Sequence, residues 1–232
     1  MSGSVQPAPQ VAVVDFGLGN LFSVAQACQT VGLRPTITQD RQVIERADAV
    51  ILPGVGAFGD AMETLRRLDL IGVLRDTPSR GVPLLGICLG VQLLMTESLE
   101  FGRHEGLGLI RGEVVPLRDP HEGARRLKVP QVGWNRLHAT GGVERWNGTP
   151  LEGLPDETFM YFVHSFVVVP EDPSVVRSTT TYGGIEFCSS VSCGRIFACQ
   201  FHPERSGARG LHVYENMRTM IAVAAEERRT SA

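Results

Sequence analysis

The sequence predicts an α/β fold, in which an open and mostly parallel β-sheet is covered by helices on both faces. In the first half of the chain, apolar runs typical of buried strands alternate with amphipathic helical patterns, as in a parallel sheet. After Gly106 the apolar runs become short and alternating, with turn residues between them, which favours a mixed or antiparallel second half. A length of 232 residues suffices for one such domain with a sizeable core.

The first half begins with a buried strand at residues 11–17, which ends in a glycine turn. Asn20 follows, and we expect its side chain to cap a helix that runs to Val31. The next expected elements are a strand at 35–38, a strand from 48 that breaks into a Pro/Gly loop, a helix with one break at 58–74, and a strand that leads into Cys88.

The second half is expected to hold strands at residues 113–117, 158–169, 184–191 and 195–201. An amphipathic helix at 211–226 closes the pattern. We interpret residues 11–232 as a single domain. Residues 1–10 contain prolines and show no periodicity, so we expect them to form a flexible tail.

Composition narrows the possible partners and compartments. A net charge of -3 without a long run of lysine or arginine gives no electrostatic footprint for nucleic acid or anionic membrane. No apolar run reaches bilayer length, and the N-terminus lacks the regions of a signal peptide, so we expect a cytoplasmic protein. The scattered cysteines do not form a disulfide framework, and Cys188, Cys193 and Cys199 lack the paired CxxC spacing of a metal site. We therefore expect no metal.

The segment Gly86-Ile87-Cys88-Leu89-Gly90 places a cysteine on a tight corner between a strand and a helix. Flanking glycines allow a sharp turn that projects the side chain, as in a nucleophile elbow with cysteine in place of serine. The partial positive charge at a helix N-terminus favours thiolate, and backbone N–H groups there can receive an oxyanion. The pattern predicts that Cys88 is a nucleophile.

A nucleophilic thiol needs a base, and His202 has the best local context among the histidines. The strand-like segment ending at Phe201 delivers it to a sheet edge, where Pro203 stops further pairing. Glu204 follows two residues later, and in an extended segment positions two apart face the same way. We therefore predict a triad of Cys88, His202 and Glu204, in which the carboxylate orients the imidazole.

Each of these residues has a plainer interpretation when taken alone. A cysteine among apolar residues is usually a packed core thiol, a lone histidine is usually structural, and a glutamate is usually solvated. The two glycines and the strand-to-helix switch around Cys88 favour the catalytic interpretation. The stretch from Gly17 to Asn20 does not continue as a dinucleotide loop, because the third glycine of that motif would fall on Phe22.

Two motifs resemble the class I (triad) glutamine amidotransferases, namely Gly86-Ile-Cys-Leu-Gly-Val-Gln-Leu-Leu and Gln200-Phe-His-Pro-Glu. Three more resemble the glutaminase subunits of imidazole glycerol phosphate synthases: Leu52-Pro-Gly-Val-Gly-Ala-Phe-Gly-Asp-Ala-Met, Gly133-Trp-Asn and Tyr161-Phe-Val-His-Ser. The resemblance covers nearly the whole chain, from residue 11 to about residue 224. It implies a flavodoxin-like class I glutamine amidotransferase fold and a glutaminase that needs no cofactor.

The resemblance also implies a role for each matching residue. Cys88 would attack the glutamine carboxamide, His202 would carry the proton and Glu204 would orient it, giving a glutamyl thioester and ammonia. The other implied positions are an oxyanion hole at Val55, Gly56 and Leu89, substrate-binding residues Gln92, Glu100, Ser165 and Phe166, and partner-facing residues Trp134, Asn135 and Arg205. Four positions depart from the family, which often has histidine, methionine, tyrosine and lysine at Gln131, Val132, Phe166 and Arg205.

The implied partner is a (β/α)8-barrel cyclase that forms a heterodimer with this chain. It would use the ammonia to make imidazole glycerol phosphate and an aminoimidazole carboxamide ribonucleotide in histidine biosynthesis. Little chain precedes the first strand or follows Glu204, so we expect the ammonia acceptor in a second protein.

Three other functions stay open on the sequence alone. A glutaminase subunit of a different synthase would keep the triad but should lack the PGVGAFGDAM segment. A cysteine peptidase of similar fold would share the corner at Cys88 without needing Gln92. A non-enzymatic interaction module would not need all three triad positions filled.

Overall fold

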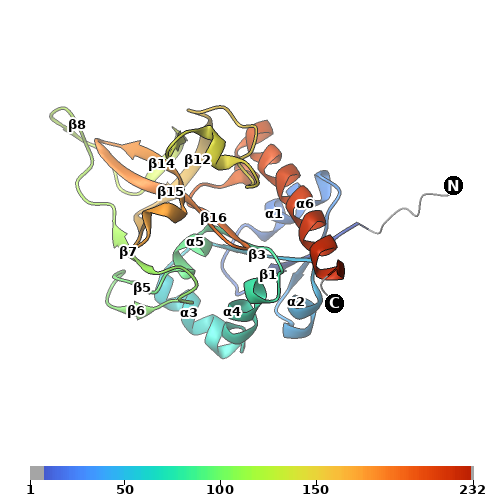
Figure 1. Ribbon diagram of the computed structural model, residues 1–232. Helices are drawn as coiled ribbons and strands as arrows, with labels where there is room; N and C mark the ends of the chain where they lie inside the picture. Colours follow the sequence, from blue (N-terminus) through green and yellow to red (C-terminus); the bar gives the residue numbers. More distant parts are fainter. Residues whose placement is uncertain (1–7, 231–232) are drawn as a thin grey trace.

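The computed structural model describes residues 8–230, so residues 1–7 of the expected tail and residues 231–232 lie outside the described part. Its centre is a long sheet with the strand order β2-β1-β3-β4-β16-β15-β13-β7-β5-β6 and with helices on both faces (Figure 1). The sheet changes from parallel to antiparallel pairing at β16 (Ile196–Cys199). This strand is parallel to β4 (Leu84–Cys88) and antiparallel to β15 (Ile185–Cys193). The predicted α/β architecture with a mixed second half is confirmed.

The parallel half consists of β1 (Gln10–Val14), β2 (Arg34–Thr38), β3 (Ala49–Gly54), β4 and β16. Every residue of β3 and β4 is buried, as expected for strands covered on both faces. The first strand spans 10–14 rather than 11–17. It begins inside the expected tail, because Gln10 pairs with Arg34 and donates its backbone N–H to Asp48 (2.8 Å).

Two groups of helices cover the two faces of the sheet (Figure 1). One face carries α1 (Leu21–Thr30) and α6 (Gly207–Thr230), which share a core with Ile51 of β3. The other face carries α2 (Arg41–Arg46), α3 (Phe58–Arg67) and α4 (Ile71–Ser79), whose core includes Leu52. Adjacent residues of one strand therefore serve opposite cores, as the pleat requires. Among the described helices, none is both long and apolar enough to cross a bilayer.

The helices agree with the sequence predictions in part. The break expected in the helix at residues 58–74 is present around Asp69, whose φ is 55°, and it separates α3 from α4, which runs on to Ser79. Asn20 occupies the N-cap position of α1, but its side chain makes no capping hydrogen bond. The sequence pattern does not predict the short helix α2, which is capped by the Asp40 side chain accepting from the Gln42 N–H. The closing helix α6 extends past both expected ends.

The antiparallel half is built from β7 (Gly112–Pro116), β13 (Phe166–Pro170), β14 (Val176–Tyr182) and β15. A separate sheet pairs β10 (Gln131–Arg136) with β12 (Phe159–His164). The single strand expected at residues 158–169 is therefore wrong, because the chain leaves one sheet at His164 and enters the other at Phe166. The pocket described below lies at this break.

The remaining elements are short. They are α5 (Leu89–Leu93), β5 (Glu97–Ser98), β6 (His104–Glu105), β8 (His121–Glu122), β9 (Arg125–Arg126), β11 (His138–Ala139), and the 3-10 helices η1 (Val143–Trp146), η2 (Pro173–Val175) and η3 (Pro203–Arg205).

Candidate active site

Cys88 occupies the corner between β4 and α5. Its backbone has φ 53° and ψ -108°, a conformation that residues with a side chain rarely adopt and that often marks a functional position. The flanking glycines make the corner possible. A Cβ at Gly90 would lie 1.9 Å from the carbonyl oxygen of Leu52, and one at Gly86 would lie 3.0 Å from the Cβ of Ala198. The sharp turn expected from the sequence is present.

His202 reaches the same edge of the sheet through β16. This strand runs parallel to β4 with Cys199 opposite Ile87, so the two strands end side by side. Beyond the strand, the backbone N–H of His202 donates to the carbonyl of Tyr161 on β12 (2.8 Å). Strand pairing therefore brings together a cysteine and a histidine that are far apart in the sequence.

Glu204 contacts His202 directly. Its Oε1 atom lies 2.8 Å from Nδ1 of the ring, and the two side chains are only 1% and 5% exposed. The contact is as expected, but the extended segment used to predict it ends at His202, because Pro203 and Glu204 belong to the 3-10 turn η3. Since Nδ1 faces Glu204, Nε2 is the nitrogen left for the thiol, and within residues 8–230 it has no oxygen or nitrogen partner.

The charge on His202 is set by its neighbours. Burial by itself would lower the pKa of the ring, but the charges and hydrogen bonds of Cys88 and Glu204 raise it to about 10. Together, the Cys88 thiolate and the Glu204 carboxylate therefore favour the protonated ring. A protonated imidazole beside a thiol is arranged to stabilise a thiolate and to deliver a proton to a leaving group.

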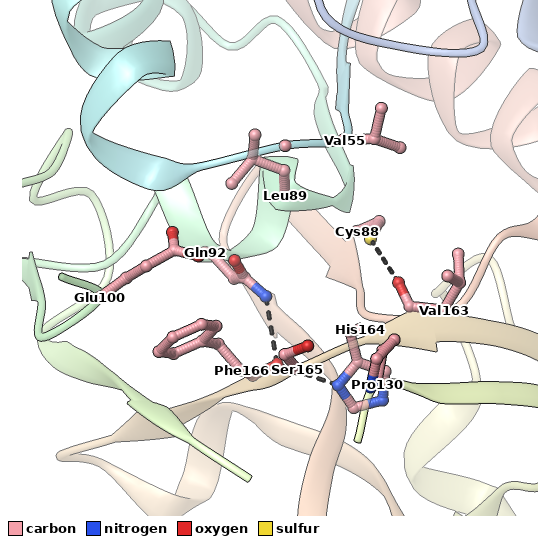
Figure 2. Close-up of a pocket in the computed structure, with 11 residues that line it drawn as sticks. Val55, Cys88, Leu89, Gln92, Glu100, Pro130, Val163, His164, Ser165 and Phe166 are labelled. Atoms are coloured by element: carbon pink, nitrogen blue, oxygen red, sulfur yellow. Dashed lines mark hydrogen bonds between the residues drawn. The ribbon is translucent and has the colours of Figure 1, made fainter. Parts of the chain in front are cut away.

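A cavity of about 240 Å³ opens beside Cys88 (Figure 2). Its wall includes Pro130, Val163 and His164 together with the residues predicted for the oxyanion hole and for substrate binding, which are Val55, Gly56, Leu89, Gln92, Glu100, Ser165 and Phe166. The structure thus gathers these predicted residues around one thiol. Their individual roles stay predictions.

Two polar side chains of the wall are held firmly. Gln92 donates from Nε2 to the backbone carbonyl of Phe166 (3.2 Å) and to Oε1 of Gln200 (3.1 Å). Glu100 accepts from the backbone N–H of Phe58 (2.5 Å) at the start of α3, where the helix dipole favours a carboxylate. Both side chains are buried. The wall opposite the thiol is therefore fixed before any ligand arrives.

His164, unlike His202, lines the cavity itself. Burial lowers its pKa to about 4, so the ring is neutral at pH 7. Nδ1 lies 2.9 Å from the carbonyl oxygen of Phe166, and Nε2 lies 3.1 Å from the side-chain oxygen Oε1 of Gln131. Both partners are oxygens, and a neutral imidazole has one N–H, so the ring donates to only one of them at a time. Without a carboxylate partner, His164 is a weaker candidate than His202 for the proton carrier.

An aromatic face lies outside the triad. Trp134, 55% exposed, packs edge-on against Tyr161 (centroids 6.1 Å apart), and Tyr161 packs against His202 (6.4 Å). The Arg205 guanidinium lies over the same ring, 4.9 Å from its centre. Asn135 instead donates from Nδ2 to a backbone carbonyl of β14 (2.8 Å). Two of the three predicted partner-facing residues therefore converge on Tyr161, while the third is engaged within the chain.

The site contains groups that the sequence analysis did not assign. Gln200 is fully buried, with Nε2 3.6 Å from Sγ of Cys88, and the carbonyl oxygen of Val163 is 3.6 Å from the same sulfur. A signal was present for Gln200, since a polar side chain ending an apolar strand needs an internal partner. Nothing in the sequence indicates Val163, because it contributes only its backbone.

Comparisons with known proteins agree with this geometry. Residues 12–219 match the family described as Glutamine amidotransferase class-I. The chain is 45% identical over 210 residues to "Imidazole glycerol phosphate synthase subunit HisH" of Aquifex aeolicus (strain VF5), covering 90% of this chain and 96% of the relative. It is 44% identical over 211 residues to the protein of the same name from Moorella thermoacetica, covering 91% and 95%.

Solved structures show the same fold at lower identity. A crystal structure of a glutamine amidotransferase aligns with a TM-score of 0.64 and 19% identity, covering 93% of this chain and 98% of that one. PurLQS from Thermotoga maritima aligns with a TM-score of 0.67 and 21% identity, covering 90% and 97%. The family match and the relatives together show that this chain belongs to the class I glutamine amidotransferases, among the HisH subunits of imidazole glycerol phosphate synthase.

Proposed function

We propose that this chain hydrolyses glutamine to glutamate and ammonia through a thioester on Cys88 and delivers the ammonia to a cyclase partner. The observation that carries the proposal is the buried His202–Glu204 pair next to Cys88, which itself lines a cavity of about 240 Å³. The names of the relatives support the destination of the ammonia. The cyclase would make imidazole glycerol phosphate and an aminoimidazole carboxamide ribonucleotide in histidine biosynthesis.

The proposed chemistry has two halves. The Cys88 thiolate attacks the carboxamide carbon of glutamine, and the C–N bond breaks as His202 gives its proton to the departing ammonia. Water then adds to the thioester and loses a proton to His202, the S–C bond breaks, and glutamate leaves. One glutamine and one water give one glutamate and one ammonia. Glu204 keeps the ring oriented and offsets its charge throughout.

Backbone N–H groups are the proposed donors to the oxyanion of the tetrahedral intermediates. Leu89 supplies the N–H next to the nucleophile, and Val55 and Gly56 lie in the wall of the same cavity. Gly56 has φ 106°, so this loop is held in a conformation that favours glycine. Because Val55 is flanked by glycines and is 40% exposed, we propose that the partner reaches it and selects the orientation in which the peptide N–H faces the oxyanion.

The substrate's amino-acid end would be held at the opposite wall. Glu100, with one carboxylate oxygen engaged by α3, offers its negative charge to the ammonium group. Gln92 offers its side-chain carbonyl, since its Nε2 hydrogens are directed to Phe166 and Gln200. The backbone at Ser165 and Phe166 would complete the pocket, at the point where the chain changes sheets.

The partner would cover the surface next to this pocket. Val132 and Trp134 on β10 are more than half exposed, and Arg205 lies beside the glutamate of the triad on η3. Exposed aromatic and arginine side chains are typical of interface anchors. We propose that a (β/α)8-barrel cyclase docks here as the second subunit of a heterodimer and encloses the path of the ammonia, because ammonia released to water would be protonated.

The decisive experiment uses Cys88→Ala in the complex with the cyclase. Glutamine-dependent synthesis should fall to background, because no thioester forms, while added ammonium salt should still support the cyclase. Ser79→Ala, on α4 and away from the pocket, is the matched control and should keep the glutamine-dependent rate. Glutamine-driven synthesis that survives in Cys88→Ala would overturn the assignment. A glutaminase that belongs to a different synthase would still release glutamate, but adding this cyclase would not raise its rate of glutamate release.

A further inference from the structure

Gln200 links the thiol to the far wall of the pocket. It is the residue after the end of β16, its side chain is fully buried, and its backbone N–H donates to the carbonyl of Ser189 (2.9 Å). Its side-chain amide lies between two site residues: Nε2 is 3.6 Å from Sγ of Cys88, and Oε1 accepts from Nε2 of Gln92 (3.1 Å). A buried amide with partners at both ends has a defined position.

The direction of the amide is fixed by a chain of donors and acceptors. The backbone carbonyl of Phe166 can only accept, so Gln92 must present its Nε2 there (Figure 2). The second hydrogen of that nitrogen is directed at Gln200, which must therefore present its oxygen. The nitrogen of Gln200 is left to face Cys88 as a donor. The opposite orientation would bring two NH₂ groups together.

The thiol and the thiolate of Cys88 make different hydrogen bonds with the groups around the sulfur. The sulfur is 3.6 Å from the Val163 carbonyl oxygen and 3.6 Å from the Gln200 nitrogen (Figure 2 shows the first contact). A thiol donates to the carbonyl and accepts from the amide. A thiolate has no proton to donate, so the carbonyl no longer helps it, while the N–H contact becomes a charge-assisted hydrogen bond.

We infer that Gln200 is a further catalytic residue, which stabilises the Cys88 thiolate through its side-chain N–H and is held in that direction by Gln92. The inference rests on the proposed role of Cys88 as the nucleophile. It adds a donor on the β16 side of the sulfur, separate from the imidazole of His202. The thiolate is then contacted by a positive ring and by a neutral amide, and only the first of these also moves a proton.

The test measures how fast iodoacetamide alkylates Cys88 in the full chain as a function of pH, by intact mass and peptide mapping. The titratable groups around the sulfur are His202, which precedes η3, Glu204 on η3, Cys199 on β16, and Glu100 and His164 in the pocket wall. These groups stay in place in Gln200→Met, which has similar volume but no donor. We expect its midpoint for alkylation to rise by about one pH unit and its rate at neutral pH to fall about tenfold.

Two further variants keep the result interpretable. Gln200→Glu has the same shape and puts an acceptor at the sulfur, so its midpoint should rise at least as far, and it carries the test if the methionine variant does not fold. Thr77→Val removes a buried hydrogen bond on α4, from Oγ1 to the Val73 carbonyl (2.7 Å), and should leave the profile unchanged. Profiles that coincide for the parent and both folded Gln200 variants would overturn the inference. A parent chain in which Cys88 resists alkylation at all pH values would instead contradict the proposed nucleophile.

Discussion

Two buried histidines near Cys88 have pKa values shifted in opposite directions. His202 follows β16 in the parallel half and is 4% exposed, and His164 ends β12 in the small antiparallel sheet and is 6% exposed. Burial lowers the pKa of both, but Cys88 and Glu204 raise that of His202 to about 10, whereas His164 stays near 4. The positive charge of His202 is itself one of the causes that lower the pKa of His164. The residues in contact, rather than the depth of burial, separate a proton carrier from a structural histidine.

The strongest test of this contrast removes each ring in turn. His202→Ala should lower kcat for glutamate release by about 10⁴-fold or more, because the thiol loses its proton carrier. His164→Asn should cost far less, on the order of tenfold, since it disturbs only the wall at Phe166. Glutamate release is measured in the complex with the cyclase. Comparable losses in the two variants would show that the charge states do not define the roles.

A smaller loss is expected when the ring stays and its carboxylate partner changes. Glu204→Gln keeps a group of the same shape at Nδ1 but removes its charge, so the imidazolium is less well supported. We expect about 10 to 100 times more residual activity than in His202→Ala, with a narrower pH range of activity. Steady-state rates of glutamate release from pH 6 to 10 would measure both the residual activity and the pH range. An activity equal to that of His202→Ala would assign Glu204 a role beyond orientation.

Opposite pKa shifts also predict opposite pH windows of stability. The pKa of His202 is raised from 6.5 to about 10 on folding, so its contribution is fully present below about pH 6.5 and is lost as the pH rises to about 10. The pKa of His164 is lowered from 6.5 to about 4, so its contribution is present above about pH 6.5 and is lost as the pH falls to about 4. Denaturant midpoints across this range should lose only the alkaline slope in His202→Gln and only the acid slope in His164→Gln. Parallel curves for the two variants would contradict the assignment.

The smallest effect is expected at Gln131, which contacts His164 from β10. Gln131→Leu leaves the ring without its second partner, and we expect KM for glutamine to rise a few-fold with little change in kcat, the scale of one buried hydrogen bond. Gln131→Asn retains an amide, so its KM for glutamine should lie between that of the parent chain and that of Gln131→Leu. Initial rates at several glutamine concentrations separate the parameters. A fall confined to kcat would place Gln131 in the chemistry instead.

The sequence predicts best where function depends on neighbours in the chain. Cys88 lies between two glycines at a change of periodicity, so the corner could be found from a few adjacent residues. The His202–Glu204 contact was predicted from an extended backbone, yet it forms through a 3-10 turn, because Pro203 begins a helical turn as readily as it ends a strand. The strand break at Ser165 and the Gln200 contact depend on which sheets pair, and no local pattern carries that information.

The closest approach at the corner concerns a residue with no chemistry of its own. Because a Cβ at Gly90 would lie 1.9 Å from the Leu52 carbonyl oxygen, no other amino acid fits between α5 and β3 without moving one of them. The requirement for glycine at this position therefore comes from the packing of α5 on β3 and does not depend on the chemistry of Cys88. A descendant of this chain that had exchanged Cys88 for an inert residue would still be obliged to keep Gly90. Among related sequences, Gly86 and Gly90 would thus indicate common ancestry. Only the residue at position 88 would distinguish an active enzyme from an inactive one.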